Sequence, residues 1–435
     1  MPPHLIQADA VAVHPDTQTT PRLRECEDCG QFQIVPALTP GTRASCFRCD
    51  AVLRQTRVDP FGLPIALNLA ALMLFFLGSA MTLLSVSTAG QHHVATLFSG
   101  PESLRASGMW ELAILVMVTT VAIPLARVLC TLTVLLGLRL ARPPRTLRMI
   151  FAWAEHLRPW SMVEIYLLGV FVAFVKLGAM VQIDLGVALY ALAGLMVVMV
   201  AGDVFLDDQA VWEEIERHEA HRPRPERTAG ALGARLTRMG CHTCGLVSRG
   251  RDGAHCPRCG FALHHRKANS ITRAWALLIA SAILYVPANM YPVLTVISLG
   301  AGQPSTILGG VHELLAAGMW PLAALVFTAS VAVPILKLFS LGFLLITTQM
   351  GWNERLRERT TLYRMVDLVG RWSMIDIFMV SILVALVKFG AIATIQPGAG
   401  ATAFAAVVIL TMLAAESFDP RLMWDAAEPS GQEHV

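Results

Sequence analysis

Charged residues are scarce in this chain of 435 residues. Asp, Glu, Lys and Arg make up 15% of it, against 55% hydrophobic residues. So little charge excludes a soluble globular domain of this length, and the net charge of +3 gives no reason to expect a nucleic-acid partner. Residues 1–24 are polar and Pro-rich and lack the apolar core of a secretory signal peptide. We expect this segment to be disordered and the first spanning helix to direct membrane insertion.

The sequence also lacks the common catalytic motifs. It contains no G-x-x-x-x-G-K-[ST] loop for nucleotide phosphates, no G-x-S-x-G nucleophile turn and no H-E-x-x-H zinc helix. We therefore expect neither an enzymatic activity nor an ATP-driven step in this chain.

Long apolar runs dominate what is present. About 20 helical residues cross the hydrocarbon core of a bilayer, and runs without period-2 alternation are helices rather than strands of a barrel. The sequence thus predicts an all-α polytopic membrane protein with eight spans, near 63–87, 108–138, 162–182, 185–205, 271–298, 319–347, 374–394 and 400–418.

Eight of the nine cysteines form two groups of paired C-x2-C turns, one ahead of each block of four spans. Two such turns supply a tetrahedral site of four thiolates, so we predict two small zinc ribbons, with rubredoxin-like iron as the alternative metal. Four protein ligands leave no open position, which indicates structural sites; a docking or sensing role is the alternative. The ligands are Cys26, Cys29, Cys46 and Cys49 in the first ribbon and Cys241, Cys244, Cys256 and Cys259 in the second.

Orientation follows from the thiolates and the basic residues. Thiolate sites persist in reducing compartments, and Lys and Arg concentrate in the segments on the cysteine side, whereas the opposite loops carry only Arg105. Both termini and both ribbons are therefore predicted to be cytoplasmic, which requires an even number of spans.

The two halves repeat at offsets of 210 to 212 residues. Four spans per half give both halves one orientation, so the expected symmetry is a pseudo-two-fold axis along the membrane normal. The repeated segments are 108–110 and 318–320, 160–165 and 372–377, and 175–178 and 387–390. The predicted domains are ribbon 1 (25–57), transmembrane domain 1 (62–206), a linker (207–239), ribbon 2 (240–266), transmembrane domain 2 (270–419) and a cytoplasmic tail (420–435).

The ribbons, the W-S-M-x-[DE] segments and the V-K-[LF]-G segments resemble the paraquat-inducible protein A family of PqiA-like and YebS-like proteins. The resemblance covers residues 24–425. It implies a Gram-negative-type inner-membrane protein that works with a periplasm-spanning MCE-domain partner and moves phospholipid between membranes. The segment 287–292 resembles a helix-breaking segment of that family, which the first half lacks around 78–81.

Several polar residues fall inside the predicted spans and are candidates for lipid binding or coupling. Lys176 and Lys388 occupy equivalent places near the periplasmic ends of the third spans. We expect them either to bind lipid phosphate in a cleft between the halves or to reach the headgroups as anchors. Glu164 and Asp376 begin the same spans and are expected to complement the helix N-termini.

Two basic residues, Arg127 and Lys337, follow a proline by three positions near the cytoplasmic side of the second spans. Their predicted partners are Asp203 and Glu416, in structural salt bridges or in proton coupling. In the fifth span, Pro287 and Pro292 flank Asn289 and predict a broken helix, either as a substrate site or as a packing kink.

These features favour a subunit that exchanges phospholipid between the outer leaflet of the inner membrane and a periplasmic partner. The loops 88–107 and 299–318 are long enough to dock that partner. A proton-coupled exporter of small molecules and a zinc-ribbon membrane sensor are the alternatives, although lysines along the pathway disfavour a cationic substrate.

Overall fold

A computed structural model describes residues 22–88, 91–140, 142–178, 182–220, 237–298, 301–387 and 393–427. Eight helices within these residues are long and apolar enough to cross a membrane, which confirms the predicted number of spans. They are Gly62–Ala80, Trp110–Gly137, Leu147–Gly178 and Val187–Phe205 in the first half, and Ser270–Met290, Trp320–Gln349, Leu356–Leu386 and Ala399–Ser417 in the second.

Both halves contain the same elements in the same order. In each half the first and fourth spans pack along each other, α1 with α7 and α9 with α15. The first half comprises α1 (Gly62–Ala80), β5 (Leu84–Thr88), β6 (Gln91–Ala95), α2 (Ser99–Ala106), α3 (Trp110–Met117), α4 (Ile123–Gly137), α5 (Leu147–Leu157), α6 (Val163–Gly178), β7 (Gln182–Leu185), α7 (Val187–Phe205) and α8 (Asp208–Ala220). The second half comprises α9 (Ser270–Met290), β10 (Leu294–Ser298), β11 (Ala301–Ser305), α10 (Ile307–Ala316), α11 (Trp320–Phe327), α12 (Val333–Gln349), α13 (Leu356–Gly370), α14 (Ile375–Leu386), β12 (Ala393–Pro397), α15 (Ala399–Ser417) and α16 (Arg421–Asp425).

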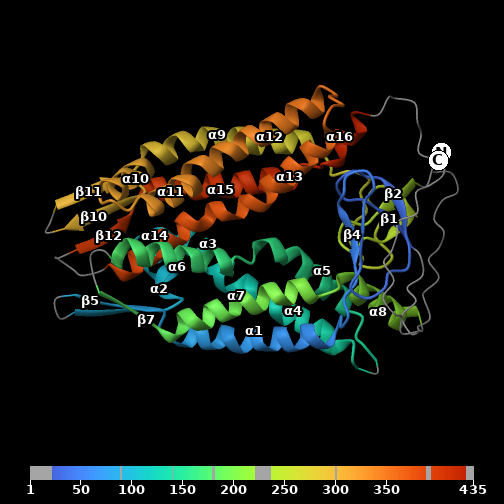
Figure 1. Cartoon of the computed structure of the whole chain (residues 1–435), viewed down its shortest axis with the longest axis horizontal. Coiled ribbons are helices and arrows are strands. Elements are labelled where there is room, and N and C mark those ends of the chain that lie inside the picture. The colour runs from blue at the N-terminus through green and yellow to red at the C-terminus, as the bar shows by residue number, and fades with distance from the viewer. Residues whose placement is uncertain are drawn as a thin grey trace.

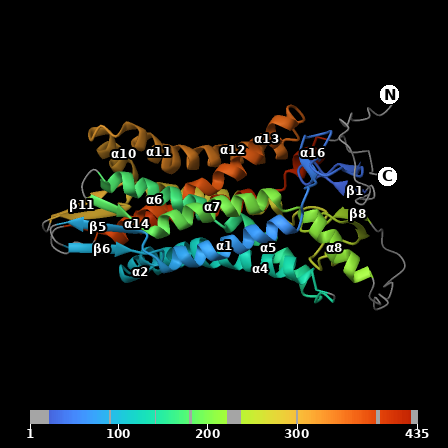
Figure 2. The ribbon, with the colours of Figure 1, turned by 60° about the horizontal axis from the view of Figure 1, so that its bottom comes forward.

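Each half carries a small antiparallel sheet that the sequence analysis did not predict. The strand orders are β6-β5-β7 and β11-β10-β12. The first and fifth apolar runs were predicted to stay helical to residues 87 and 298, whereas α1 ends at Ala80 and α9 at Met290. Alternating β-branched residues in L-S-V-S-T and L-T-V-I-S favour strands at these positions. Figures 1 and 2 place both sheets at the end of the molecule opposite the ribbons.

The second spans are continuous although each contains a proline. A π-helical turn of five residues, Val118–Ala122 or Thr328–Ala332, ends two residues before Pro124 or Pro334. The wider turn tolerates the missing amide donor, and nearby hydroxyls bond carbonyls of the preceding turn, as Thr120 Oγ1 does to the Val116 carbonyl at 2.6 Å.

The third spans are longer than predicted and bent. They run over Leu147–Gly178 and Leu356–Leu386 instead of 162–182 and 374–394, and a 3-10 turn, Arg158–Trp160 or Arg371–Met374, divides each of them. At about 1.5 Å per residue, helices of this length exceed the hydrocarbon core, so α5 and α13 project toward the ribbons.

The two ribbons cross over to the opposite halves. Ribbon 1 is built from β1 (Arg22–Glu25), β2 (Phe32–Val35), β3 (Arg43–Ser45) and β4 (Val52–Gln55), and ribbon 2 contains β8 (Thr237–Gly240) and β9 (Val247–Gly250). The cysteines of ribbon 1 share a hydrophobic cluster with α9, α12 and α15 of the second half. Those of ribbon 2 share one with α4, α5 and α8 of the first half. Strand β1 also begins within the segment predicted to be disordered.

The halves meet along α6 and α14. Gly169 lets the two helices approach closely, and the rings of Tyr166 and Phe378 lie edge to face at 5.7 Å between centroids. Helix α14 also packs on α2 of the first half, which makes its span the most buried of the eight described.

Candidate metal centres and membrane cavities

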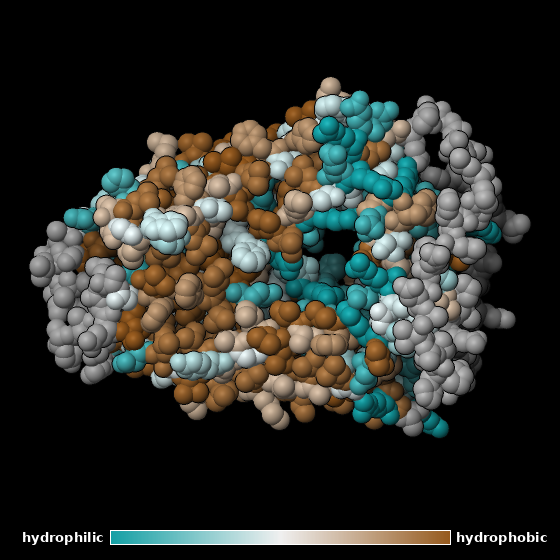
Figure 3. Space-filling view, in the orientation of Figure 1, coloured by the Kyte–Doolittle hydropathy of each residue, from teal (hydrophilic) through white to brown (hydrophobic). Residues whose placement is uncertain are grey.

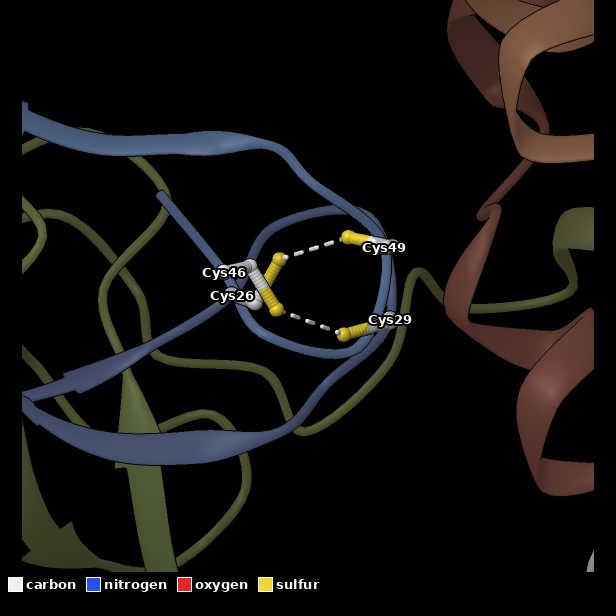
Figure 4. A group of neighbouring side chains, drawn as sticks. All are labelled: Cys26, Cys29, Cys46 and Cys49. Carbon is white, nitrogen blue, oxygen red and sulfur yellow. Dashed lines mark hydrogen bonds between the residues drawn. The ribbon is translucent and has the colours of Figure 1, made fainter. Parts of the chain in front are cut away.

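Each group of four cysteines converges on one point. All four sulfurs of a group lie within 4.8 Å of one another, and all eight residues are buried. Figure 4 shows the side chains of Cys26, Cys29, Cys46 and Cys49 directed toward a common centre, with a Cys26–Cys49 sulfur separation of 3.4 Å. Metal–sulfur bonds of about 2.3 Å in a tetrahedron place sulfurs about 3.8 Å apart, so the donor sets fit a four-thiolate metal site.

The backbone of the four C-x2-C turns is suited to such sites. Gly30, Gly245 and Gly260 follow the second cysteine of three turns with φ between 67° and 85°, and Asp50 takes the same place in the fourth with φ 62°. Amides of these residues bond back to the carbonyl of the first cysteine, as Gly30 does to Cys26 at 2.9 Å. This left-handed closure is the one expected for glycine and tolerated by aspartate.

Side chains from the opposite half contact the first centre. Arg364 of α13 donates to the Asp28 carboxylate at 2.8 Å and to the Cys49 carbonyl at 3.2 Å. Within ribbon 1 itself, Gln33 of β2 donates to the Cys46 sulfur at 2.8 Å. Arg364 could not be identified from the sequence, because its contact depends on the crossing of the ribbons.

A buried ion-pair junction joins both ribbons to the C-terminal segment. Arg421, 1% exposed, donates to Glu25 of ribbon 1 at 2.8 Å and to Asp419 at 3.0 Å. Its guanidinium also lies 2.7 Å from Nε2 of His242 in ribbon 2. Burial and the neighbouring Arg421 lower the pKa of His242 to about 4, so the neutral imidazole accepts this bond at pH 7. The described part of the predicted cytoplasmic tail is therefore packed rather than free.

Of the two predicted intramembrane pairs, the structure brings one together. Arg127 is ion-paired with Asp203, and Arg158 lies 3.8 Å from the same carboxylate and 3.3 Å from that of Asp208. Lys337 instead donates to Thr411 Oγ1 at 3.0 Å and to the Gly370 carbonyl at 3.4 Å. The pairing of Lys337 with Glu416 was therefore wrong, because the missing side chain of Gly370 leaves space into which the shorter Lys side chain turns.

The fifth span is not broken as predicted. Helix α9 contains Pro287 and continues to Met290, and Pro292 lies beyond it, before β10. Asn289 Nδ2 donates to the Tyr285 carbonyl, one helical turn earlier, at 2.9 Å. The two prolines therefore mark the end of a helix at the sheet side.

Lys176 and Asp376 face one narrow cavity between the halves. The cavity measures about 40 Å³ and is also lined by Ser330 and by residues of β10 and α10. Asp376 is 7% exposed, and its Oδ2 atom has no hydrogen-bond partner among the described residues. Lys388 lies outside the described residues. Asp376 lies in the first turn of α14, where it was expected to complement the helix N-terminus, and its buried carboxylate lines the same cavity as Lys176.

Glu164, the counterpart of Asp376, has a different environment. It is exposed and lines an open groove of about 590 Å³ whose other walls are apolar. Ligand sites usually measure about 300–1,000 Å³, so this groove has the size of one. Its lining includes Leu168, Phe171 and Leu189 of the first half and Trp372 of the second.

A third cavity lies closer to the ribbons. It measures about 250 Å³ and is lined by charged residues of both signs, among them Arg158, Lys337 and Arg371, and Asp367 and Glu416. Figure 3 shows a polar-lined opening between the two halves near the ribbon end, where the apolar belt stops. Glu416 thus shares a cavity with Lys337 without pairing with it.

Fold and centres together define a polytopic membrane protein of two tandem four-helix repeats with two four-thiolate sites. The profile of the family described as paraquat-inducible protein A matches residues 63–216 and 271–428, one segment per half. The chain belongs to the paraquat-inducible protein A family.

Relatives cover almost the whole chain. The "Intermembrane transport protein PqiA" of Escherichia coli K12 is 35% identical over 414 residues, which is 94% of this chain and 97% of the relative. The "Lipophilic envelope-spanning tunnel protein A" of the same organism is 31% identical over 98% of this chain and 97% of its own. A "Probable intermembrane transport protein" of Haemophilus influenzae is 28% identical over 93% and 96%, respectively. No solved structure matches the chain.

Proposed function

We propose that this protein is the inner-membrane subunit of an intermembrane phospholipid transport system, with no enzymatic activity of its own. The relatives named as intermembrane transport proteins support transport between membranes. The single observation that carries a lipid substrate is the open groove of about 590 Å³, apolar except for Glu164, at the depth of the membrane spans. An acyl chain is the ligand that such a groove accommodates best.

We further propose that the ribbons face the cytoplasm and hold zinc. Four buried thiolates need a reducing compartment, and zinc is the metal that a tetrahedral all-sulfur site favours. The sheets at the opposite end then face the periplasm. There the strands at the sheet edges, such as β6 and β11, offer unpaired backbone groups to a periplasm-spanning MCE-domain partner.

Filling the groove tests the lipid proposal. Leu168→Trp is expected to reduce the phospholipid retained by the purified protein about tenfold, because the indole occupies the space of the acyl chain. Mass spectrometry of lipid extracts measures this. The matched control is Leu129→Trp, since Leu129 is a membrane-facing leucine, 43% exposed, that does not line the groove. Equal retention by both variants would exclude the groove as the lipid site.

Lys176 and Lys388 provide a second test of the lipid proposal. Lys176→Met combined with Lys388→Met is expected to reduce transfer of labelled phospholipid out of proteoliposomes about tenfold or more, if an ammonium group binds the phosphate during passage. Arg105→Gln, an exposed charge of α2 at the same end, is the control and should retain transfer. Unchanged transfer and unchanged lipid crosslinking in the double variant would leave the lysines as membrane anchors.

A further inference from the structure

The charged cavity near the ribbons, here called the vestibule, contains unpaired charges of both signs. It measures about 250 Å³ and lies between the 3-10 turn of the first half and α12, α13 and α15 of the second. Among the described residues, the side chains of Asp367, Arg371 and Glu416 have no hydrogen-bond or ion-pair partner. Arg127 and Asp203, at a comparable place inside the first half, satisfy each other.

Asp367 and Glu416 are exposed and Arg371 is half-buried, so water solvates these charges and a ligand of complementary charge can take the place of that water. The vestibule has room for a small polar group, and its opposite charges are complementary to a zwitterion. Arg371 offers guanidinium donors for a phosphate, and Asp367 and Glu416 offer carboxylates for an ammonium group.

Residues that are close together in the sequence line the apolar groove and the vestibule. Arg371 lines the vestibule and Trp372 lines the groove, while Trp160 lines the vestibule and Glu164, one helical turn later, lines the groove. The same two bends in the third spans thus present a polar cavity toward the ribbons and an apolar groove toward the membrane interior. This order matches an amphiphile with its headgroup at the ribbon side.

We propose that the vestibule binds the headgroup of an amine-bearing zwitterionic phospholipid, such as phosphatidylethanolamine, from the leaflet on the ribbon side. The phosphate lies against Arg371, the ammonium group against Asp367 and Glu416, and one acyl chain enters the groove beside Trp372. This inference rests on the proposed lipid transport and adds to it the headgroup class and the leaflet that supplies the lipid.

The test compares two phospholipids on the full-length purified protein. Phosphatidylethanolamine and phosphatidylglycerol are offered together in mixed micelles, and native mass spectrometry measures the bound ratio. The double variant D367N and E416Q is expected to lower the bound phosphatidylethanolamine-to-phosphatidylglycerol ratio about tenfold, because the ammonium group loses its charged acceptors. R371Q is expected to lower the binding of both lipids, and R371K to restore most of it.

Controls separate the vestibule from surface charge in general. R273Q and E354Q make the same chemical changes at exposed residues that do not line the vestibule, and they should leave the ratio at the wild-type value. Thermal melts identify a variant that fails to fold, in which case the single variants D367N and E416Q replace the double one and are each expected to lower the ratio.

Three outcomes would overturn the proposal. One is an unchanged ratio in the acidic variants. Another is tighter binding of O-phosphoethanolamine than of phosphatidylethanolamine, which would make the ligand a soluble zwitterion. The last is loss of lipid from Leu168→Trp but not from R371Q, which would leave the lipid function intact and remove the vestibule from it. Absence of phospholipid from the wild-type protein would count against the proposed function itself.

Discussion

Cys256→Ser is expected to loosen helices of the first half, although Cys256 belongs to the ribbon that precedes the second half. The cysteines of ribbon 2 form a hydrophobic cluster with Phe151 of α5 and Trp212 of α8, both at most 1% exposed. A four-thiolate zinc site contributes about 10–16 kcal/mol to the folding of small zinc modules, so loss of one ligand unfolds the ribbon. Hydrogen exchange by mass spectrometry should then rise in α5, which is the specific reporter because α8 also pairs with ribbon 1 through Arg54 and Glu213 at 2.8 Å.

The reciprocal variant makes this prediction specific. Cys49→Ser in ribbon 1 is expected to raise exchange in α13 and α16 of the second half, because ribbon 1 packs on Trp424 and receives hydrogen bonds from Arg364. Cys130→Ser is the control, since Cys130 lies in α4 outside both centres and should change neither pattern. If each ligand variant instead perturbed only the half that follows it in sequence, the ribbons would not be crossed in the membrane.

Removal of the metal by a chelator should raise hydrogen exchange in both sets of helices together. Each of the two single variants should contain about half of the wild-type metal content. The crossing makes the ribbons a connection between the halves at one end of the protein. Arg421 strengthens this connection, because it bonds Glu25 of ribbon 1 and lies against His242 of ribbon 2.

The spans and the metal ligands were predictable because their signals are local. Apolar length identifies a membrane helix, and the spacing of two C-x2-C turns identifies a four-thiolate group, whatever the rest of the chain does. The repeat of 210 to 212 residues then assigned corresponding positions to the two halves. Arg127 and Asp203 could be paired in advance because both lie in the ribbon-side parts of spans of the same half.

What the sequence did not reveal depends on long-range packing. The strands β5 and β10 are short and closely follow long apolar helices, so hydropathy averaged over a window extends the helix through them. The order of the segments along the chain does not reveal which half each ribbon packs on. Equivalent positions also diverge: Glu164 is exposed in a groove whereas Asp376 is buried, because α14 is enclosed by α6 and α2 and α6 is open toward α7 on one side.

Gly169→Ala adds only one methyl group but is expected to destabilise the contact between the halves strongly. A Cβ atom at this position would lie 2.9 Å from Cβ of Phe378 and 3.3 Å from the amide nitrogen of Met379, and backbone cannot yield as a flexible side chain does. Overpacking of this kind costs about 1–3 kcal/mol, and Gly169→Leu should exceed that range. Thermal unfolding of the purified protein, followed by circular dichroism, measures the loss.

Gly194 provides the matched control for this helix contact. A Cβ atom there would meet only side-chain atoms of Leu74, at 3.4 Å, within the first half. Gly194→Ala should therefore be neutral or stabilise by about 0.5–1 kcal/mol through helix propensity. Because α6 and α14 also frame the cavity of Lys176 and Asp376, Gly169→Ala is expected to lower lipid transfer while Gly194→Ala retains it. Equal melting temperatures for the two variants would mean that α6 and α14 do not approach this closely in the membrane. The cavities between the halves would then have a different lining.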